Sequence, residues 1–291
     1  MKNATAILLI LVLISCNQTS NSPKGIIITS PEIAELAAHI APETIIAVTN
    51  ECNYPPLLKS LPKVGKFGEI NLEEIIKLNP EAVITTGMEQ EIVTEKLKKL
   101  GIKTIPMYLT SVTSMPDKIN DLAKILNKPE KGKVLSDSLK NLIKELEINI
   151  PLHKPTIYIE IYHEPIMTVS DESLVGDVVR LSGVKNIFPE LPREYCRINQ
   201  EEVVEANPDI ILITYEGITA EDIANRKGWQ NINAVKNRRI YTPADINPDL
   251  ILRATLRTFD GIELMKKLFN QEEQKLNNKY QESKTLNLSL N

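Results

Sequence analysis

The sequence predicts an α/β protein with two Rossmann-like lobes, one long backbone helix joining them, and a ligand cleft between the lobes. Three observations predict this fold. Short strand patterns alternate with amphipathic helical patterns along most of the 291 residues, which is typical of mostly parallel sheets covered by helices. Two successive helical patterns interrupt the alternation near the middle of the chain. A twelve-residue motif occurs once on each side of that interruption, as expected of a duplicated unit.

The N-terminal lobe is expected over residues 25–128. Its strand signals are short apolar runs, and its helix signals are apolar residues spaced three and four apart. Gly101 is typical of the residue that follows a helix C-terminus. The predicted strands cover 25–29, 44–48, 82–86 and 103–106, and the predicted helices cover 31–40, 71–78, 89–100 and 115–126.

The linking helix is expected over residues 129–150. A helical pattern at 131–148 follows Pro129 and is ended by Pro151 and Pro155, because proline is tolerated only in the first turn of a helix. A pattern of that length rises roughly 27 Å, about the width of a small domain. We therefore expect a rod that permits little hinge motion between the lobes. Its predicted apolar stripe comprises Val134, Leu135, Ser138, Leu139, Leu142, Ile143 and Leu146.

The C-terminal lobe is expected over residues 151–269, and a polar tail over 270–291. The alternation of strands and helices resumes here, and Gly183 stops the first helix. The predicted strands cover 156–161, 166–169, 209–214 and 239–242, and the predicted helices cover 174–181, 199–206 and 249–268.

Residues 1–16 have the features of a lipoprotein signal. An apolar run over 6–14 is too short to span a bilayer and fits a signal-peptide core. It ends in Leu13-Ile14-Ser15-Cys16, which resembles the bacterial lipobox, and the resemblance implies a lipid on Cys16. Residues 17–24 are expected to form a flexible tether. We therefore expect a lipid-anchored protein outside the cytoplasm, periplasmic or on the outer face of a bacterial membrane; an ordinary cleaved signal is the alternative.

Composition and motifs exclude several classes of function. The net charge of −4 and the absence of a basic stripe argue against a nucleic-acid partner. The chain lacks the common catalytic motifs for zinc proteases, serine hydrolases and phosphate-binding enzymes. We therefore expect a binding protein rather than an enzyme, although an exported enzyme stays open as an alternative.

The repeated motif lies at 70–81 and again at 198–209, with six of its twelve positions identical. Each copy places an asparagine at a helix N-cap and a glutamate at the third helical position, which predicts a capping box in both. The preceding glutamates, Glu73 and Glu201, are not needed for the cap. They are expected to point outward, and exposed carboxylates suit arginines on a partner protein.

An aromatic residue lies six positions before each of these glutamates: Phe67 in the first copy and Tyr195 in the second. Two facing lobes would bring the rings to opposite walls of one cleft, where they can stack on a flat, largely apolar ligand. The alternative is that each ring only closes the end of its own lobe.

The chain resembles a known family. The stretches that carry the resemblance are Cys52-Asn53-Tyr54-Pro55-Pro56, Leu61-Pro62-Lys63-Val64-Gly65, Phe67 and Asn71-Leu72-Glu73. They are similar to the helical-backbone (class III) solute-binding proteins of ABC importers for cobalamin, haem and ferric siderophores, and closest to the cobalamin-binding branch. The likeness covers roughly residues 25–268. The chain differs from the usual pattern of the family in having Phe67 and Tyr195 where tryptophan is common.

The resemblance implies a surface lipoprotein that binds a corrinoid and delivers it to an importer built of permease and ATPase. Tyr54 would line the pocket, Phe67 and Tyr195 would pack on the corrin, and Glu73 and Glu201 would engage arginines on the importer. The protein would act as a monomer and have no cofactor of its own. Haem or a ferric siderophore is the alternative ligand, and a metal ion is a further one.

Several other residues are candidates for the site. Asn53, Lys66, Tyr162 and Arg197 are expected near the ligand, and Asp245 at its rim. His163 is a candidate axial ligand, although a lone histidine in such a loop is more often a surface residue. Cys52 and Cys196 could pair across the cleft, bind a metal or be small pocket walls. Tyr108, Tyr158 and Trp229 are expected in the core.

Overall fold

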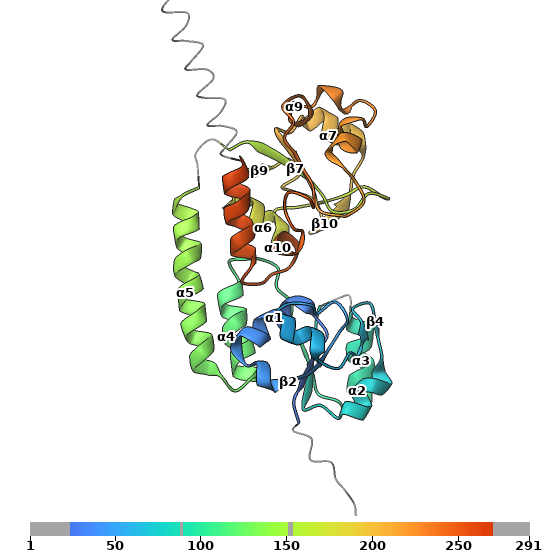
Figure 1. The fold of residues 1–291 in the computed structure, drawn as a ribbon, viewed down its shortest axis with the longest axis vertical. Coiled ribbons are helices and arrows are strands. Elements are labelled where there is room, and N and C mark those ends of the chain that lie inside the picture. Colours follow the sequence, from blue (N-terminus) through green and yellow to red (C-terminus); the bar gives the residue numbers. More distant parts are fainter. Residues whose placement is uncertain (1–23, 88–89, 151–153, 270–291) are drawn as a thin grey trace, which may run out of the picture.

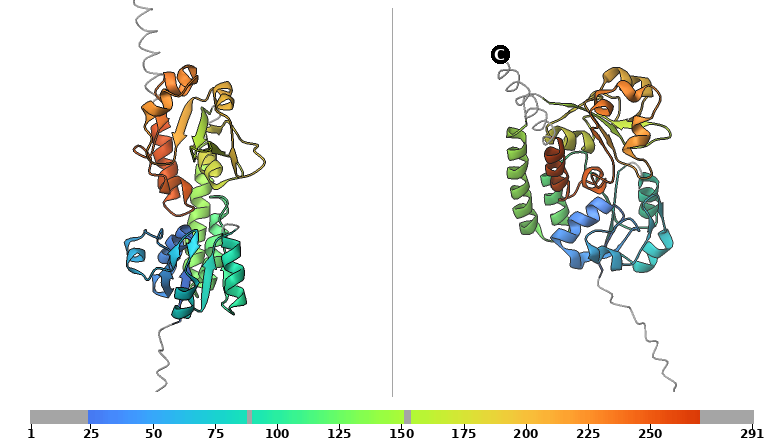
Figure 2. Two further views of the ribbon diagram at one scale, coloured as in Figure 1. Left: turned by 90° about the vertical axis from the view of Figure 1, so that its right-hand side faces the viewer. Right: turned by 45° about the horizontal axis from the view of Figure 1, so that its top comes forward.

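The computed structural model describes residues 24–87, 90–150 and 154–269. Two α/β lobes lie one above the other, and one long helix, α5 (Pro129–Ile148), runs along one side of both (Figure 1; Figure 2, left). The predicted fold class is therefore confirmed. The signal with Cys16, nearly all of the tether and the polar tail lie outside the described residues.

The N-terminal lobe is built on a four-stranded parallel sheet with the order β2-β1-β5-β6. Its strands are β1 (Ile26–Ile28), β2 (Ile45–Val48), β5 (Ala82–Thr85) and β6 (Thr104–Pro106). Its helices are α1 (Pro31–Ile40), α2 (Leu72–Leu78) and α3 (Glu91–Lys99), with 3-10 turns η1 (Pro42–Thr44) and η2 (Pro56–Ser60). A hairpin of β3 (Gly65–Lys66) and β4 (Glu69–Ile70) precedes α2.

The C-terminal lobe repeats this plan. Its parallel sheet has the order β9-β7-β11-β12. Numbered by their order in the lobe, the strands read 2-1-3-4, as they do in the N-terminal sheet. The strands are β7 (Thr156–Glu160), β9 (Lys185–Asn186), β11 (Ile210–Ile213) and β12 (Ile240–Tyr241), and β8 (Met167–Val169) pairs with β10 (Tyr195–Arg197) in a separate antiparallel ribbon. Helices and turns cover the sheet: α6 (Leu174–Leu181), α7 (Gln200–Ala206), α8 (Ala220–Ala224), η4 (Trp229–Asn231), α9 (Asn233–Lys236) and α10 (Asp249–Leu252).

The sequence repeat therefore reflects a structural duplication. The first copy forms α2 and leads into β5, and the second forms α7 and leads into β11. Both helices precede the third strand of their sheet. In both sheets the first and third strands are neighbours. The chain leaves the first strand toward one edge of the sheet and leaves the third strand toward the other edge. Ligands of such sheets bind outside the carboxyl ends of the strands at this point.

Helices α4 (Met115–Ile125) and α5 (Pro129–Ile148) pack against each other beside the lobes (Figure 1). Their contact is close at Gly132, where a β-carbon would lie 2.2 Å from Cβ of Ala123. The buried face of α5 is narrower than predicted. Leu139, Ile143 and Leu146 are buried, but the side chain of Val134 is 72% exposed. The reason is that α5 has neighbours on one side only.

One continuous apolar cluster joins the two lobes to these helices. It includes Ile28 of β1, Ile119 of α4, Ile157 of β7 and Ile262 of the last helix. Because both lobes pack on the same close-packed interior, a wide hinge opening would break apolar contacts. Limited hinge motion between the lobes stays a prediction.

The final helix differs from the prediction. The sequence pattern predicts one helix over 249–268, but α10 ends at Leu252 and a second helix covers 258–269. Arg253 has extended backbone angles, with φ −110° and ψ 124°. Thr255 N donates to Oγ1 of Thr258 at 3.1 Å, which caps the second helix. The break lets the intervening segment reach the N-terminal lobe.

Candidate functional site

A cavity of about 190 Å³ lies between the lobes. Phe67, Thr86 and Tyr108 line it from the N-terminal lobe, and Leu174 and Tyr195 line it from the C-terminal lobe. Thr86 directly follows β5, so the cavity lies at the carboxyl edge of the N-terminal sheet. Its other lining residues are Glu32, Leu109, Leu252 and Ala254.

Phe67 is held at the tip of the β3–β4 hairpin. Its backbone N donates to Oε2 of Glu51 at 2.9 Å, and its carbonyl accepts from Nε2 of Gln90 at 2.9 Å. Gly65 has φ +103°, a conformation that favours glycine, and a β-carbon there would lie 2.4 Å from the carbonyl O of Glu69. The hairpin therefore fixes the backbone that carries the ring. Tyr195, on the other wall, begins β10.

A hydrogen bond joins the lobes beside the cavity. Tyr108 Oη donates to Oε2 of Glu194 at 2.9 Å. Tyr108 follows β6, and Glu194 directly precedes β10. The sequence predicts Tyr108 in the core; it is instead half-buried and lines the cavity.

The segment between α10 and the last helix attaches the C-terminal part of the chain to the N-terminal lobe. Arg257 donates two hydrogen bonds, at 2.7 and 2.6 Å, to the fully buried carboxylate of Glu35. The Glu35 hydrogen bond raises the pKa of Arg257. The guanidinium also lies 4.1 Å from the ring centroid of Tyr54, and Arg253 Nη1 donates to Oδ1 of Asn53 at 2.9 Å. Tyr54 and Asn53 thus belong to a contact between lobes and are not among the residues lining the cavity.

A second contact lies nearer the helix pair. Thr113 N, just before α4, donates to Oδ2 of Asp177 in α6 at 3.0 Å. Asp177 also pairs with Arg180, whose Nη2 lies 2.6 Å from Oδ1. Ionic and polar contacts thus reinforce the apolar cluster that the lobes share.

The corresponding strand ends of the C-terminal sheet are filled by a polar cluster. The buried carboxylate of Glu160, at the end of β7, accepts from Arg226 Nη1 and Nη2 at 2.6 and 2.7 Å. Tyr215 and Tyr158 also donate to it. Burial raises the pKa of Glu160, but the bonds from Arg226 and Tyr215 outweigh it and hold the pKa below its usual value. Burial and the nearby carboxylate raise the pKa of both tyrosines.

His163 lies at the edge of this cluster. Arg226 Nη2 is 3.1 Å from its Nδ1. Arginine can only donate, so Nδ1 accepts, and the neutral ring carries its proton on Nε2. A protonated Nε2 has no free lone pair for a metal ion. This arrangement therefore disfavours His163 as an axial ligand, and no cluster of three or more metal-binding side chains occurs among the described residues.

The cavity, its two aromatic walls and the repeated sheets invite comparison with known proteins. The profile of the periplasmic binding protein family matches residues 26–253. The chain belongs to this family. Its predicted relationship to solute-binding proteins of ABC importers is thereby confirmed. Membership of this family places the protein among the extracytoplasmic binding proteins. Within the described residues, no helix is long and apolar enough to span a membrane.

Three relatives show what this periplasmic binding protein is similar to. The ABC transporter substrate-binding lipoprotein YvrC of Bacillus subtilis is 26% identical over 83% of this chain and 78% of its own. The vitamin B12-binding protein of Vibrio vulnificus is 27% identical over 91% of this chain and 97% of its own. The structure of Staphylococcus aureus IsdE complexed with heme has a TM-score of 0.72 at 22% identity, covering 84% of this chain and 98% of that one. The relatives imply an ABC importer as partner.

The repeated helices of this binding protein begin differently. In α7, Glu202 Oε2 accepts the N–H of Asn199 at 2.8 Å, which completes the predicted capping box. In α2, Asn71 accepts from the N–H groups of Glu73 and Glu74, but its own N–H donates to the carbonyl of Val64 instead. The predicted box is therefore incomplete in α2. Glu73 and its counterpart in α7 are both exposed.

The remaining candidates lie apart from the inter-lobe cavity. Lys66 and Tyr162 are exposed and do not line it, and Arg197 lines a different cavity on the C-terminal lobe. Cys52 and Cys196 are both free thiols, and burial raises the pKa of the Cys52 thiol.

Sequence reasoning missed the residues that connect the lobes: Tyr108, Glu194, Arg253 and Arg257. Their partners are far away in the chain, so no local pattern marks them. The one available signal was the pair of arginines in a segment otherwise predicted to be amphipathic helix. A buried partner for Arg257 could not be inferred from spacing.

Proposed function

We propose that this binding protein captures a corrinoid between its lobes and delivers it to an ABC importer. The observation that carries the proposal is the cavity that has Phe67 on one wall and Tyr195 on the other. Aromatic faces on opposite walls suit a flat, largely apolar macrocycle, because stacking adds to the apolar area that leaves water. The relationship to a vitamin B12-binding protein supports the same ligand class.

Loading requires the cavity to enlarge. Its volume of about 190 Å³ is below the roughly 300–1,000 Å³ of pockets that hold drug-sized ligands. The contacts of Arg257 with Glu35 and the shared apolar cluster hold the lobes together away from the cavity. The bond from Tyr108 to Glu194 is the weaker connection. We therefore propose that a ligand enters by breaking this bond and shifting the nearby loops, without a wide hinge motion.

The direct test is an absorbance titration of the purified protein with cyanocobalamin. The wild-type protein should bind, and the double variant Phe67→Ala with Tyr195→Ala should bind at least tenfold more weakly, because each ring contributes roughly 1 kcal/mol of stacking beyond its apolar area. Tyr162→Ala is the matched control, since Tyr162 is an exposed aromatic residue that lines neither cavity. Equal affinity of the double variant and the control would contradict the proposal.

Haem is the second candidate ligand, because the fold is shared with a protein whose structure holds heme. A haem ligand requires an axial donor in most binding sites, and the contact of Arg226 with Nδ1 of His163 disfavours that residue. Titration with haem discriminates the two ligands. A bound haem with a shifted Soret band and no binding of cyanocobalamin would favour haem over the corrinoid.

Delivery is proposed to rest on Glu73 and Glu201. Each is exposed on the first turn of its helix, where the positive end of the helix dipole favours a carboxylate. Helices α2 and α7 lie on the side of the molecule away from α5, one in each lobe (Figure 1). We propose that the pair docks on arginines of the importer while the protein, a monomer, is held at the membrane by lipid on Cys16. Cys16→Ser should release the protein from the membrane fraction.

A further inference from the structure

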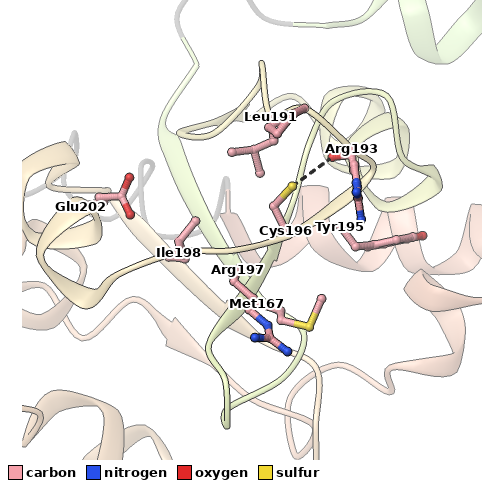
Figure 3. Close-up of a pocket in the computed structure, with 9 residues that line it drawn as sticks. Met167, Leu191, Arg193, Tyr195, Cys196, Arg197, Ile198 and Glu202 are labelled. Atoms are coloured by element: carbon pink, nitrogen blue, oxygen red, sulfur yellow. Dashed lines mark hydrogen bonds between the residues drawn. The ribbon is translucent and has the colours of Figure 1, made fainter.

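A second cavity, of about 630 Å³, opens on the C-terminal lobe next to the inter-lobe cavity. The two cavities share Tyr195, which lines both. Figure 3 shows the second cavity, with Arg193 beside Tyr195 and Arg197 beside Met167. A ligand stacked on the ring of Tyr195 can therefore extend a substituent into this space.

Two arginines of this cavity, Arg193 and Arg197, have exposed guanidinium groups without a hydrogen-bond or ion-pair partner in the part of the chain that the structure describes. The situation of Arg226 and Arg257 is different, because each is paired with a buried carboxylate. Arg197 lies two residues after Tyr195 in the extended strand β10, and alternate residues of a strand share a face. Arg193 lies two residues before Tyr195 in the sequence, so one arginine precedes and one follows the residue that the two cavities share.

Glu202 is the carboxylate among the lining residues of this cavity. Its Oε2 already accepts the N–H of Asn199 in the capping box at 2.8 Å. In Figure 3 it lies at the opposite end of the cavity from Arg193. The lining residues other than Glu202 therefore carry two positive charges and no carboxylate.

We propose that this second cavity binds an anionic arm of the ligand whose ring stacks on Tyr195. Guanidinium groups bind phosphate and carboxylate oxygens in pairs of parallel hydrogen bonds, so a phosphodiester or a carboxylate is the chemical class that fits. The inference rests on the proposed function, because it needs a ring-shaped ligand in the adjacent cavity. It adds a binding subsite for the substituent that hangs from that ring.

The test compares three probes on three proteins: the wild type, a test variant and a control variant. Cyanocobalamin carries a phosphodiester arm, cobinamide has the same corrin without that arm, and haem carries two carboxylates. The test variant is Arg193→Gln with Arg197→Gln. The matched control is Lys236→Gln with Arg238→Gln, which removes the same charge from exposed positions that line neither cavity.

The test variant should bind cyanocobalamin about tenfold more weakly or worse, since each charge-assisted hydrogen bond contributes enough for roughly that factor. Its affinity for cobinamide should stay unchanged, and the control should match the wild type with both. A selective loss of haem binding would instead assign the subsite to carboxylates, which also supports the inference.

Two results overturn it: equal weakening for cyanocobalamin and cobinamide, or no change with any probe that the wild type binds. If the wild-type protein binds none of the three probes, the proposed function itself fails and this inference fails with it. The two kinds of failure are therefore distinguishable in one set of titrations.

Discussion

Removing the hydroxyl of Tyr108 should tighten ligand binding. Tyr108→Phe deletes the bond to Glu194, which spans the lobes at 2.9 Å beside the cavity, but keeps the aromatic ring that lines it. A hydrogen bond to a charged group contributes roughly 1.5 kcal/mol net. If the ligand must break this bond to enter, the variant saves that cost. An equilibrium shift of this size corresponds to an affinity gain of about tenfold.

The assay is a titration of wild type, Tyr108→Phe and Glu194→Gln with cyanocobalamin, with circular dichroism to check that all three are folded. Glu194→Gln keeps an acceptor but removes its charge, so an intermediate gain is expected. Unchanged or weaker binding by a folded Tyr108→Phe protein would show that ligand entry does not require the loss of this bond. It would mean that the bond persists in the loaded state or that it stabilises the bound ligand.

The other predictions concern the polar cluster, the helix pair and the docking residues. Glu160→Gln should lower the free energy of unfolding at neutral pH by about 3 kcal/mol, because it leaves Arg226 buried without a charged partner. The pKa of Glu160 is lowered in the folded protein, so its contribution to stability is fully present above the ordinary pKa of 4.5 and is lost as pH falls through the folded-state pKa. Urea titrations at several pH values should therefore show a smaller acid-induced loss of unfolding free energy in the variant than in the wild type. An equal loss in both proteins would contradict this prediction. Gly132→Ala should destabilise the protein by about 1–3 kcal/mol, because the new methyl group meets α4 at 2.2 Å. The control Gly68→Ala, which has open space, should be neutral in the same urea titration, and equal stability of both variants would contradict the close packing. Replacing the exposed carboxylates of both repeats, Glu73→Ala with Glu201→Ala, should leave ligand affinity unchanged and reduce uptake by cells roughly tenfold, whereas full uptake would exclude them from docking.

The repeat made much of the fold predictable. Strand and helix patterns are local properties of the chain, and the motif at 70–81 and 198–209 showed that the lobes are duplicates. The same duplication predicted that Phe67 and Tyr195 occupy corresponding places, and the structure puts both in the wall of one cavity. A repeated position in two facing lobes carries tertiary information that a single position does not.

Contacts between distant residues were not predictable in this way. Tyr108 and Glu194 are 86 positions apart, and Arg257 and Glu35 are 222 apart. The predicted helix at 249–268 failed for the same reason: its periodicity continues through 253–257, but these residues leave the helix and Arg257 reaches a buried carboxylate. Tertiary pairing overrides a local preference when the alternative is a buried charge without a partner.

The capping box of α2 shows the same limit at a smaller scale. Its residues match those of α7, yet the N–H of Asn71 bonds to Val64 in the neighbouring hairpin segment. The side chain of Glu74 therefore takes no part in the cap, and its Oε2 lies 3.7 Å from Nζ of Lys77. The same pair of capping residues thus forms different hydrogen bonds when its surroundings differ.

A crystal structure of the protein with bound cyanocobalamin would show directly where the ligand lies. We predict a corrin ring between Phe67 and Tyr195, with the bond between Tyr108 and Glu194 broken and the contact of Arg257 with Glu35 intact. A corrin bound elsewhere, or these two aromatic rings in contact with protein alone, would contradict the central claim.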